Sequence, residues 1–87
     1  MEPYTNLSIT SDYIIREFDQ NIDPHELMWH RDLQDRTVTV LEGEGWFFQL
    51  ENQLPVELKQ NTSIFIPRLE WHRIIKGIST LKIKIEE

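Results

Sequence analysis

Short runs in which apolar and polar residues alternate are the feature that most constrains how this chain folds. The clearest run covers residues 80–86, where leucine and isoleucine alternate with lysine and glutamate. Successive side chains of a β-strand point to opposite faces, so this run predicts a strand with one buried and one solvated face. Comparable runs cover residues 36–41, 46–50, 56–59, 63–66 and 71–76, with glycine, proline or asparagine between them. We therefore expect an all-β fold of about eight short strands, either a β-sandwich or a small barrel.

The first third of the chain carries weaker patterns. Residues 13–18 favour a strand over a helical turn, and residues 1–12 are expected to be an extension or an edge strand. Asp23 followed by Pro24 is typical of a turn or a single helical turn, and residues 27–32 are expected to be extended. The length of 87 residues leaves room for a single domain, residues 1–87, with a core from about residue 13 to about residue 85.

Charge and composition exclude several classes of function. Nine basic residues against 15 acidic ones give a net charge of −6, which repels a phosphate backbone, so no nucleic-acid partner is expected. No apolar run approaches the ~20 residues that cross a bilayer, and the acidic, polar first residues are not expected to form a secretory signal. We expect a cytoplasmic protein with no membrane partner. The chain has no cysteine, hydrolase elbow or dinucleotide fingerprint, so no organic cofactor is expected.

Two histidines and one aspartate have the spacing of a metal site. His30 and Asp32 lie two positions apart, so on an extended segment their side chains share a face. His72 begins a different predicted strand. If the two segments are neighbours, two imidazoles and one carboxylate converge, a set that holds Fe(II) and also accepts Mn, Ni or Zn. His25 lies in a polar turn and is expected to be exposed.

The stretch from His30 to His72 resembles the cupin superfamily, small β-barrels of the double-stranded β-helix type. The first cupin motif runs His-x-His, three or four residues, Glu, six residues, Gly. The spacing is kept here from His30 to Gly43, but Asp32 replaces the second histidine and Arg36 replaces the glutamate. Because of these two substitutions, the metal ligands that the resemblance implies are reduced to His30, Asp32 and His72.

The second cupin motif runs Gly, five residues, Pro-x-Gly-x-x-His. Pro67 and His72 are retained, whereas Asn61 and Leu69 stand in place of the two glycines. Asparagine tolerates the left-handed backbone conformation, but leucine there is uncomfortable if the turn needs positive φ. The resemblance covers about residues 13 to 85 and includes the order of the predicted strands as well as the two motifs. It implies a jelly-roll barrel.

The resemblance implies either of two functions. Many cupins bind a divalent metal and catalyse isomerisation, epimerisation, decarboxylation or oxygenation, whereas others are metal-free binding or regulatory modules. Arg36 shares a face with Val38 and Val40 and cannot be a ligand, because guanidinium offers no lone pair. It would either clamp the carboxylate or phosphate of a small anionic molecule beside the metal, or pair with Asp32 in a metal-free module.

Aromatic residues fall on both faces of the predicted strands. With Trp46 and Phe48 facing inward, we expect both to line the substrate site together with Arg36. Phe47 and Phe65 then face outward. Outward aromatic residues on a small barrel favour contact between sheets of two subunits, so a homodimer is expected.

Overall fold

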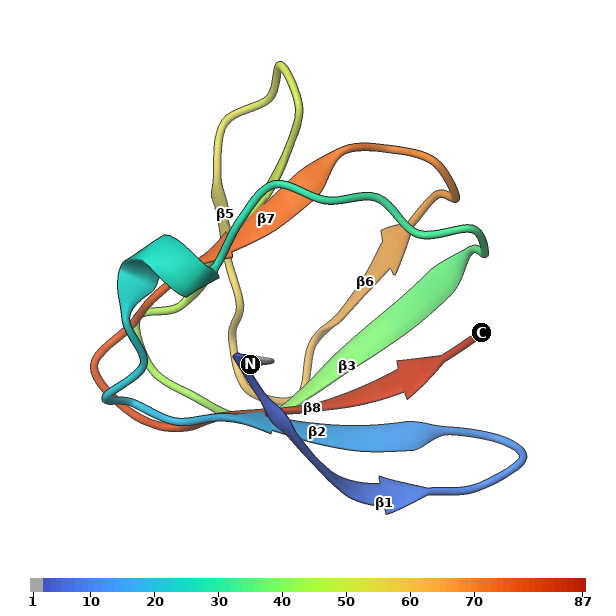
Figure 1. The fold of residues 1–87 in the computed structure, drawn as a ribbon, viewed down its shortest axis with the longest axis horizontal. Coiled ribbons are helices and arrows are strands. Elements are labelled where there is room, and N and C mark those ends of the chain that lie inside the picture. The colour runs from blue at the N-terminus through green and yellow to red at the C-terminus, as the bar shows by residue number, and fades with distance from the viewer. Residues whose placement is uncertain (1–2) are drawn as a thin grey trace.

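A computed structural model describes residues 3–87 of the chain. These residues form two antiparallel sheets and a short 3-10 helix, as Figure 1 shows. The larger sheet has the order β1-β2-β8-β3-β6 and the smaller has the order β5-β4-β7. The eight strands within residues 3–87 are β1 (Thr5–Ile9), β2 (Ile14–Phe18), β3 (Arg36–Glu42), β4 (Phe47–Leu50), β5 (Val56–Glu57), β6 (Ser63–Ile66), β7 (His72–Ile75) and β8 (Leu81–Glu86).

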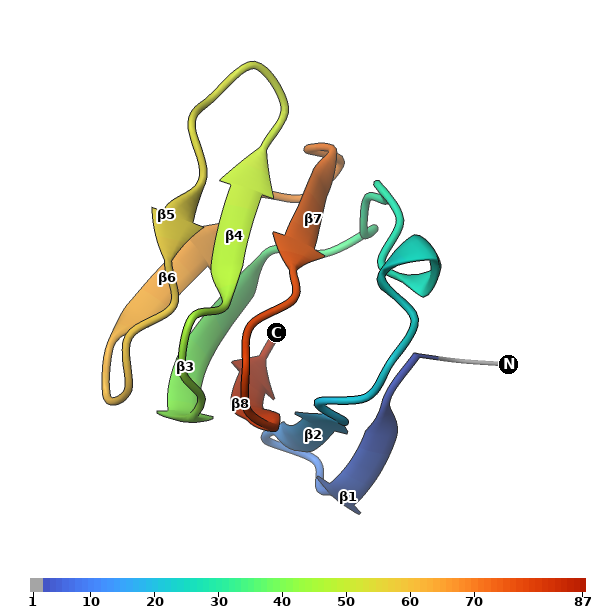
Figure 2. The same cartoon turned by 90° about the vertical axis from the view of Figure 1, so that its left-hand side faces the viewer.

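The two sheets face each other, as Figures 1 and 2 show. The buried apolar side chains of residues 3–87 form one hydrophobic cluster. In β8, Leu81, Ile83 and Ile85 are buried while the lysines between them are partly exposed, as their alternation predicts. Phe48 of β4 in the smaller sheet and Trp46, which directly precedes β4, belong to the same core. The prediction of an all-β fold of about eight short strands is therefore confirmed.

Tertiary pairing changes several details of the predicted elements. Residues 5–9 form β1, an edge strand on β2, while residues 1–2 of the predicted N-terminal extension lie outside the described part. The expected strand over 56–59 is shortened to β5, although Leu58 remains buried in the core. Residues 24–26 form a 3-10 helix, and the Asp23 side chain caps it by accepting a hydrogen bond from the backbone N–H of His25. Within residues 3–87, no helix is long and apolar enough to cross a membrane.

The aromatic side chains follow the predicted alternation. Trp46 and Phe48 are buried, whereas Phe65 is 58% exposed on the edge strand β6 and Phe47 is partly exposed. The outward position of Phe65 is compatible with contact to a second subunit, and the homodimer stays a prediction.

The two ends of the sandwich differ in burial and polarity, and the antiparallel strands β4 and β7 run from one end to the other. Phe47 pairs with Ile75 near one end, and Leu50 pairs with His72 at the other. We call the first the closed end, where the fully buried residues are Val40, Trp46 and Leu81. We call the second the open end, where the polar residues are His30, Asp32, Arg36 and His72.

Candidate metal centre

Backbone pairing brings His30 and His72 together at the open end. Each residue donates its backbone N–H to the carbonyl of the other, over 2.9 Å from His30 and 2.8 Å from His72. This isolated antiparallel bridge puts the two side chains directly opposite each other on one face. The imidazole rings meet edge to face with centroids 4.3 Å apart. Side chains from distant parts of the sequence therefore converge at the place where the metal site was predicted.

Asp32 completes the cluster, because it lies two residues after His30 and shares its face. The Asp32 Oδ2 atom lies 3.3 Å from Nε2 of His72, and one donor atom from each of the three residues lies within 4.8 Å of the others. The backbone carbonyl of Asp32 accepts a 2.8 Å hydrogen bond from the N–H of Leu69. The turn before β7 therefore holds the segment that carries Asp32 and His30.

Hydrogen bonds to backbone carbonyls orient both imidazoles. Nδ1 of His30 lies 3.1 Å from the carbonyl oxygen of Met28, and Nδ1 of His72 lies 2.9 Å from that of Glu70. A carbonyl oxygen only accepts, so each Nδ1 carries the proton and donates it. In the neutral rings, each Nε2 atom therefore presents a lone pair, the arrangement that metal-binding histidines use.

The His72 imidazole is neutral at neutral pH. Burial of the ring lowers the pKa of His72 below its ordinary value of about 6.5, because a charged ring would lose its hydration. The hydrogen bond to the Glu70 carbonyl and the Asp32 carboxylate raise the pKa, but burial has the larger effect. The Nε2 atom that faces Asp32 is therefore a lone-pair donor and not an N–H group.

An oxygen of Asp32 lacks a hydrogen-bond partner in this arrangement. Within residues 3–87, Asp32 Oδ2 is a buried side-chain atom with no hydrogen bond. Nη1 of Arg36 approaches the same oxygen at 3.4 Å, which is ion-pair range but longer than an ordinary hydrogen bond. Two electron-pair donors, Oδ2 of Asp32 and Nε2 of His72, thus face each other at 3.3 Å and repel unless a cation lies between them.

The donor set fits a divalent metal ion. Nitrogen and carboxylate ligands lie about 2.0–2.2 Å from a metal such as Zn, so two of them at a tetrahedral angle are roughly 3.4 Å apart. The 3.3 Å separation of Asp32 Oδ2 and His72 Nε2 agrees with that spacing. A set of two imidazoles and one carboxylate also leaves positions open, as in the facial set of non-haem Fe(II) sites.

Arg36 makes its shorter contact with a residue that sequence reasoning missed. Its Nε atom donates to Oε2 of Glu87 over 2.7 Å, and the Arg36 side chain is 19% exposed while that of Glu87 is 32% exposed. The contact follows from the register of β3 and β8, in which Thr37 pairs with Glu86. No motif signalled this role for Glu87, because it depends on which strands are neighbours in the sheet.

The cluster opens into a cavity of about 390 Å³ between the two sheets. Its lining includes the three candidate ligands, Arg36 and Phe48, together with an apolar wall that contains Leu58, Ile64 and Ile66. Trp46, which we expected in the substrate site, is not among the lining residues. It is fully buried at the closed end, where its indole N–H donates to the Ser79 carbonyl over 2.8 Å. His25 is exposed, as expected, and bonds to Asp23.

The two residues that replace the cupin-motif glycines lie in turns, and both have positive φ. Asn61 has φ of 68° and Leu69 has φ of 65°. Both positions therefore have the left-handed conformation without a glycine. At Leu69 this backbone conformation is strained, because a branched-chain residue rarely adopts it.

Comparisons with known proteins agree on the fold. No protein-family model matches the chain, and no curated protein matches it. Solved structures do match. A cupin-2 domain protein from Shewanella frigidimarina has a TM-score of 0.66 at 20% identity, covering 97% of this chain and 78% of that one. An RmlC-like cupin with a double-stranded β-helix fold from Methanocaldococcus jannaschii has a TM-score of 0.68 at 20% identity, covering 95% and 76%.

One similar structure holds a metal. The Fe(II) form of HppE in complex with its substrate has a TM-score of 0.67 at 17% identity, and the match covers 97% of this chain and 52% of HppE. At such low identities the likeness concerns the fold alone. Together with the two facing antiparallel sheets, it establishes that this chain has the fold of a small cupin.

Proposed function

We propose that this protein binds a divalent metal ion through His30, Asp32 and His72 and holds a small anionic molecule beside it. The observation that carries the proposal is the pair of facing lone-pair donors, Asp32 Oδ2 and His72 Nε2, 3.3 Å apart. The Asp32 oxygen is buried without a hydrogen bond, a costly arrangement that a cation would relieve. The Fe(II) in the similarly folded HppE supports iron as one candidate, beside Mn, Ni and Zn.

The charges around the cluster favour an anionic ligand once a metal is bound. With neutral imidazoles, the carboxylates of Asp32 and Glu87 and the guanidinium of Arg36 leave one negative charge in excess. A divalent ion would reverse this to one positive charge in excess. Arg36 lies at the edge of the cavity and is well placed to bind a carboxylate or phosphate with its planar fork, in place of Glu87.

The chain's own residues would fix the position and surroundings of the bound molecule. Arg36 would hold its anionic group, while Phe48 and the apolar wall would exclude water from the rest. A bound divalent ion would supply Lewis acidity toward an oxygen of this molecule.

The second candidate function is metal-free binding, and the Arg36–Asp32 ion pair favours it. The Nη1–Oδ2 distance is 3.4 Å, and the side chains are 19% and 15% exposed. In this reading the guanidinium replaces the metal charge, and the protein is a binding or regulatory module. The two functions differ in one measurable property, the affinity for a divalent ion.

Elemental analysis and thermal unfolding of untagged protein separate the two functions. Under the metal proposal, purified protein carries stoichiometric metal. After that metal is removed with a chelator, adding back Fe(II), Mn, Ni or Zn at about 100 times Kd contributes about 2.7 kcal/mol to stability. For a domain of this size we expect Tm to rise by roughly 10–20 °C. His72→Gln should abolish the shift, and His25→Gln is the matched control, because the His25 side chain is 96% exposed and away from the cavity. Protein that stays metal-free with an unchanged Tm in all four metals supports the module instead.

A further inference from the structure

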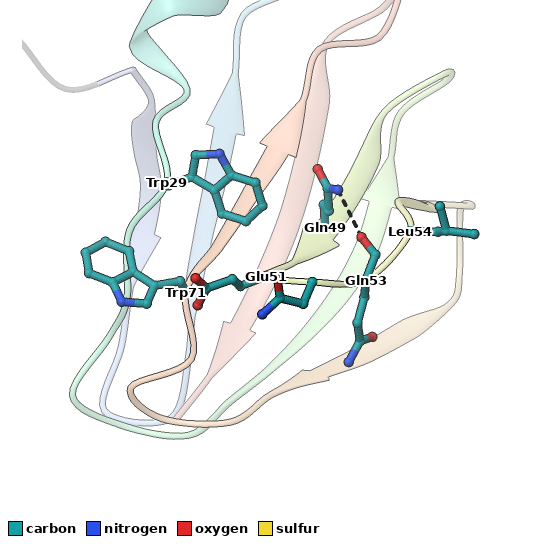
Figure 3. A pocket seen from close by; sticks show the side chains of 7 residues that line it. Trp29, Gln49, Glu51, Gln53, Leu54 and Trp71 are labelled. Carbon is teal, nitrogen blue, oxygen red and sulfur yellow. Dashed lines mark hydrogen bonds between the residues drawn. The ribbon is translucent and has the colours of Figure 1, made fainter.

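A second concave feature lies on the outer face of the smaller sheet and is unrelated to the metal proposal. It is a cleft of about 600 Å³, a size typical of ligand sites. Trp29 and Trp71 form one side and Leu54 stands on the opposite side, as Figure 3 shows. The lining residues are Trp29, Gln49, Glu51, Asn52, Gln53, Leu54 and Trp71, and we call this feature the Trp cleft.

Strand alternation separates the Trp cleft from the metal cavity. His30 and His72 both line the metal cavity, His30 at its exposed rim. Their neighbours Trp29 and Trp71 line the Trp cleft, as alternation along an extended chain predicts. Gln49 likewise lies between Phe48 and Leu50 on β4 and points outward. The two concave features share only Trp29 among their lining residues.

The two indole rings are held in place by neighbouring arginines. The guanidinium of Arg73 lies over the Trp29 ring, 4.9 Å from its centroid, and that of Arg31 lies 5.1 Å from the centroid of Trp71. Each tryptophan nevertheless remains 40% exposed. A ligand that stacks on these rings would therefore meet side chains that have already lost much of their freedom, which reduces the entropic cost of binding.

Amide groups beside the rings are also fixed by hydrogen bonds. Nε of Arg73 donates to Oε1 of Gln49 over 2.9 Å. Nε2 of Gln49 donates to the backbone carbonyl of Gln53 over 2.9 Å, the dashed line in Figure 3. The backbone N–H of Glu51 donates to the Trp71 carbonyl over 2.9 Å, which ties the loop to the aromatic side of the cleft. The side chains of Glu51, Asn52 and Gln53 add hydrogen-bond acceptors and donors to the lining.

We propose that the Trp cleft binds a neutral saccharide. A sugar ring has one face of polarised C–H groups, which suits the electron-rich face of an indole, and a rim of hydroxyl groups that both donate and accept hydrogen bonds. The Trp cleft provides indole rings for the C–H face and polar side chains for the hydroxyl groups. A cationic ligand is disfavoured, because Arg31 and Arg73 already hold their positive charges against the two indoles.

Tryptophan indole N–H signals in a nitrogen-15 NMR titration test this proposal. Maltotriose, cellotriose and chitotriose are the probes, because they present sugar rings of different linkage and substitution. We expect at least one to shift the Trp29 and Trp71 signals saturably, with a Kd on the order of 1 mM. The Trp46 signal is an internal control, because its N–H is bonded to Ser79 at the closed end and should not move.

Variants assign the binding to the Trp cleft. Trp71→Ala should weaken binding at least about tenfold. Gln53→Ala, at an exposed position, should weaken it too and serves if Trp71→Ala does not fold. Phe65→Ala is the matched control, since it removes an exposed aromatic ring from the other sheet and should leave Kd unchanged. The proposal is overturned if no probe gives a saturable shift up to roughly 20 mM. It is also overturned if the Trp29 and Trp71 signals move with protein concentration alone, which would assign the surface to a second copy of the chain.

Discussion

The closed end and the open end of this sandwich are built from the same strands but satisfy their polar atoms differently. At the closed end, Trp46 is fully buried and its single polar atom donates to a backbone carbonyl. At the open end, Asp32 Oδ2 is buried without a hydrogen bond and faces a neutral imidazole. The difference suggests that the closed end supplies folding stability, while the open end keeps polar groups in an arrangement that a ligand would complete.

The largest effect that we predict concerns the closed end and Gly77. A Cβ atom at Gly77 would lie 2.5 Å from Cδ1 of Trp46 and 2.6 Å from the carbonyl carbon of Gly45, and it would also collide with the Glu44 carbonyl oxygen. Two of these atoms belong to the backbone and cannot turn away. We expect Gly77→Ala to lower the free energy of unfolding by about 3 kcal/mol, measured by urea denaturation.

Gly45→Ala is the control for this prediction. The nearest atom to a Cβ at Gly45 is 3.6 Å away, so space is adequate, but its φ of 76° is unfavourable for alanine. We expect a loss of about 1 kcal/mol, from backbone conformation alone. Equal losses in the two glycine variants would show that close packing is not what stabilises the closed end.

The second effect concerns the open end and has the opposite sign. In metal-free protein, Asp32→Asn should raise the free energy of unfolding by about 1 kcal/mol, because an amide N–H can donate to Nε2 of His72 and no buried charge remains. The same variant should lose metal binding, measured by calorimetric titration. A loss of stability of similar size would instead show that the Arg36–Asp32 ion pair stabilises the fold, as the metal-free module requires.

The smallest effect concerns the strained turn that precedes His72. Leu69 has φ of 65° and the residue is 48% exposed, so glycine there would relieve strain and lose little packing. We expect Leu69→Gly to raise stability by about 0.5–1 kcal/mol, measured by thermal unfolding. Asn61→Gly should change stability less, because asparagine tolerates its φ of 68°. A destabilised Leu69→Gly would mean that the leucine side chain, and not the backbone, organises this turn.

Local patterns predicted most of the fold. The alternation in residues 80–86 placed Leu81, Ile83 and Ile85 on the buried face, and the structure confirms it. The expected strand over residues 56–59 was too long, because only Val56 and Glu57 find partners on β4. A strand ends where its neighbour ends, and the side-chain pattern of one segment does not contain that information.

The candidate site was predictable in part. The two-residue spacing indicated that His30 and Asp32 share a face, and the resemblance to cupins indicated that His72 would join them. The inward face also included Trp46, which alternation could not separate from Phe48. Trp46 precedes β4 and is buried at the closed end, whereas Phe48 lies within β4 and lines the cavity. Alternation reports which face a side chain occupies and not how far along the barrel it lies.

The sequence by itself determined which side chains can be buried together, because the period of two in a strand and the turn residues between strands are local properties. The tertiary structure alone decided which polar atoms meet. The pairing of β3 with β8 joined Arg36 to Glu87, and the bridge between His30 and His72 set two imidazoles beside one carboxylate. These contacts depend on register between distant segments, which is fixed by the packing of the whole core and not by any single stretch of sequence.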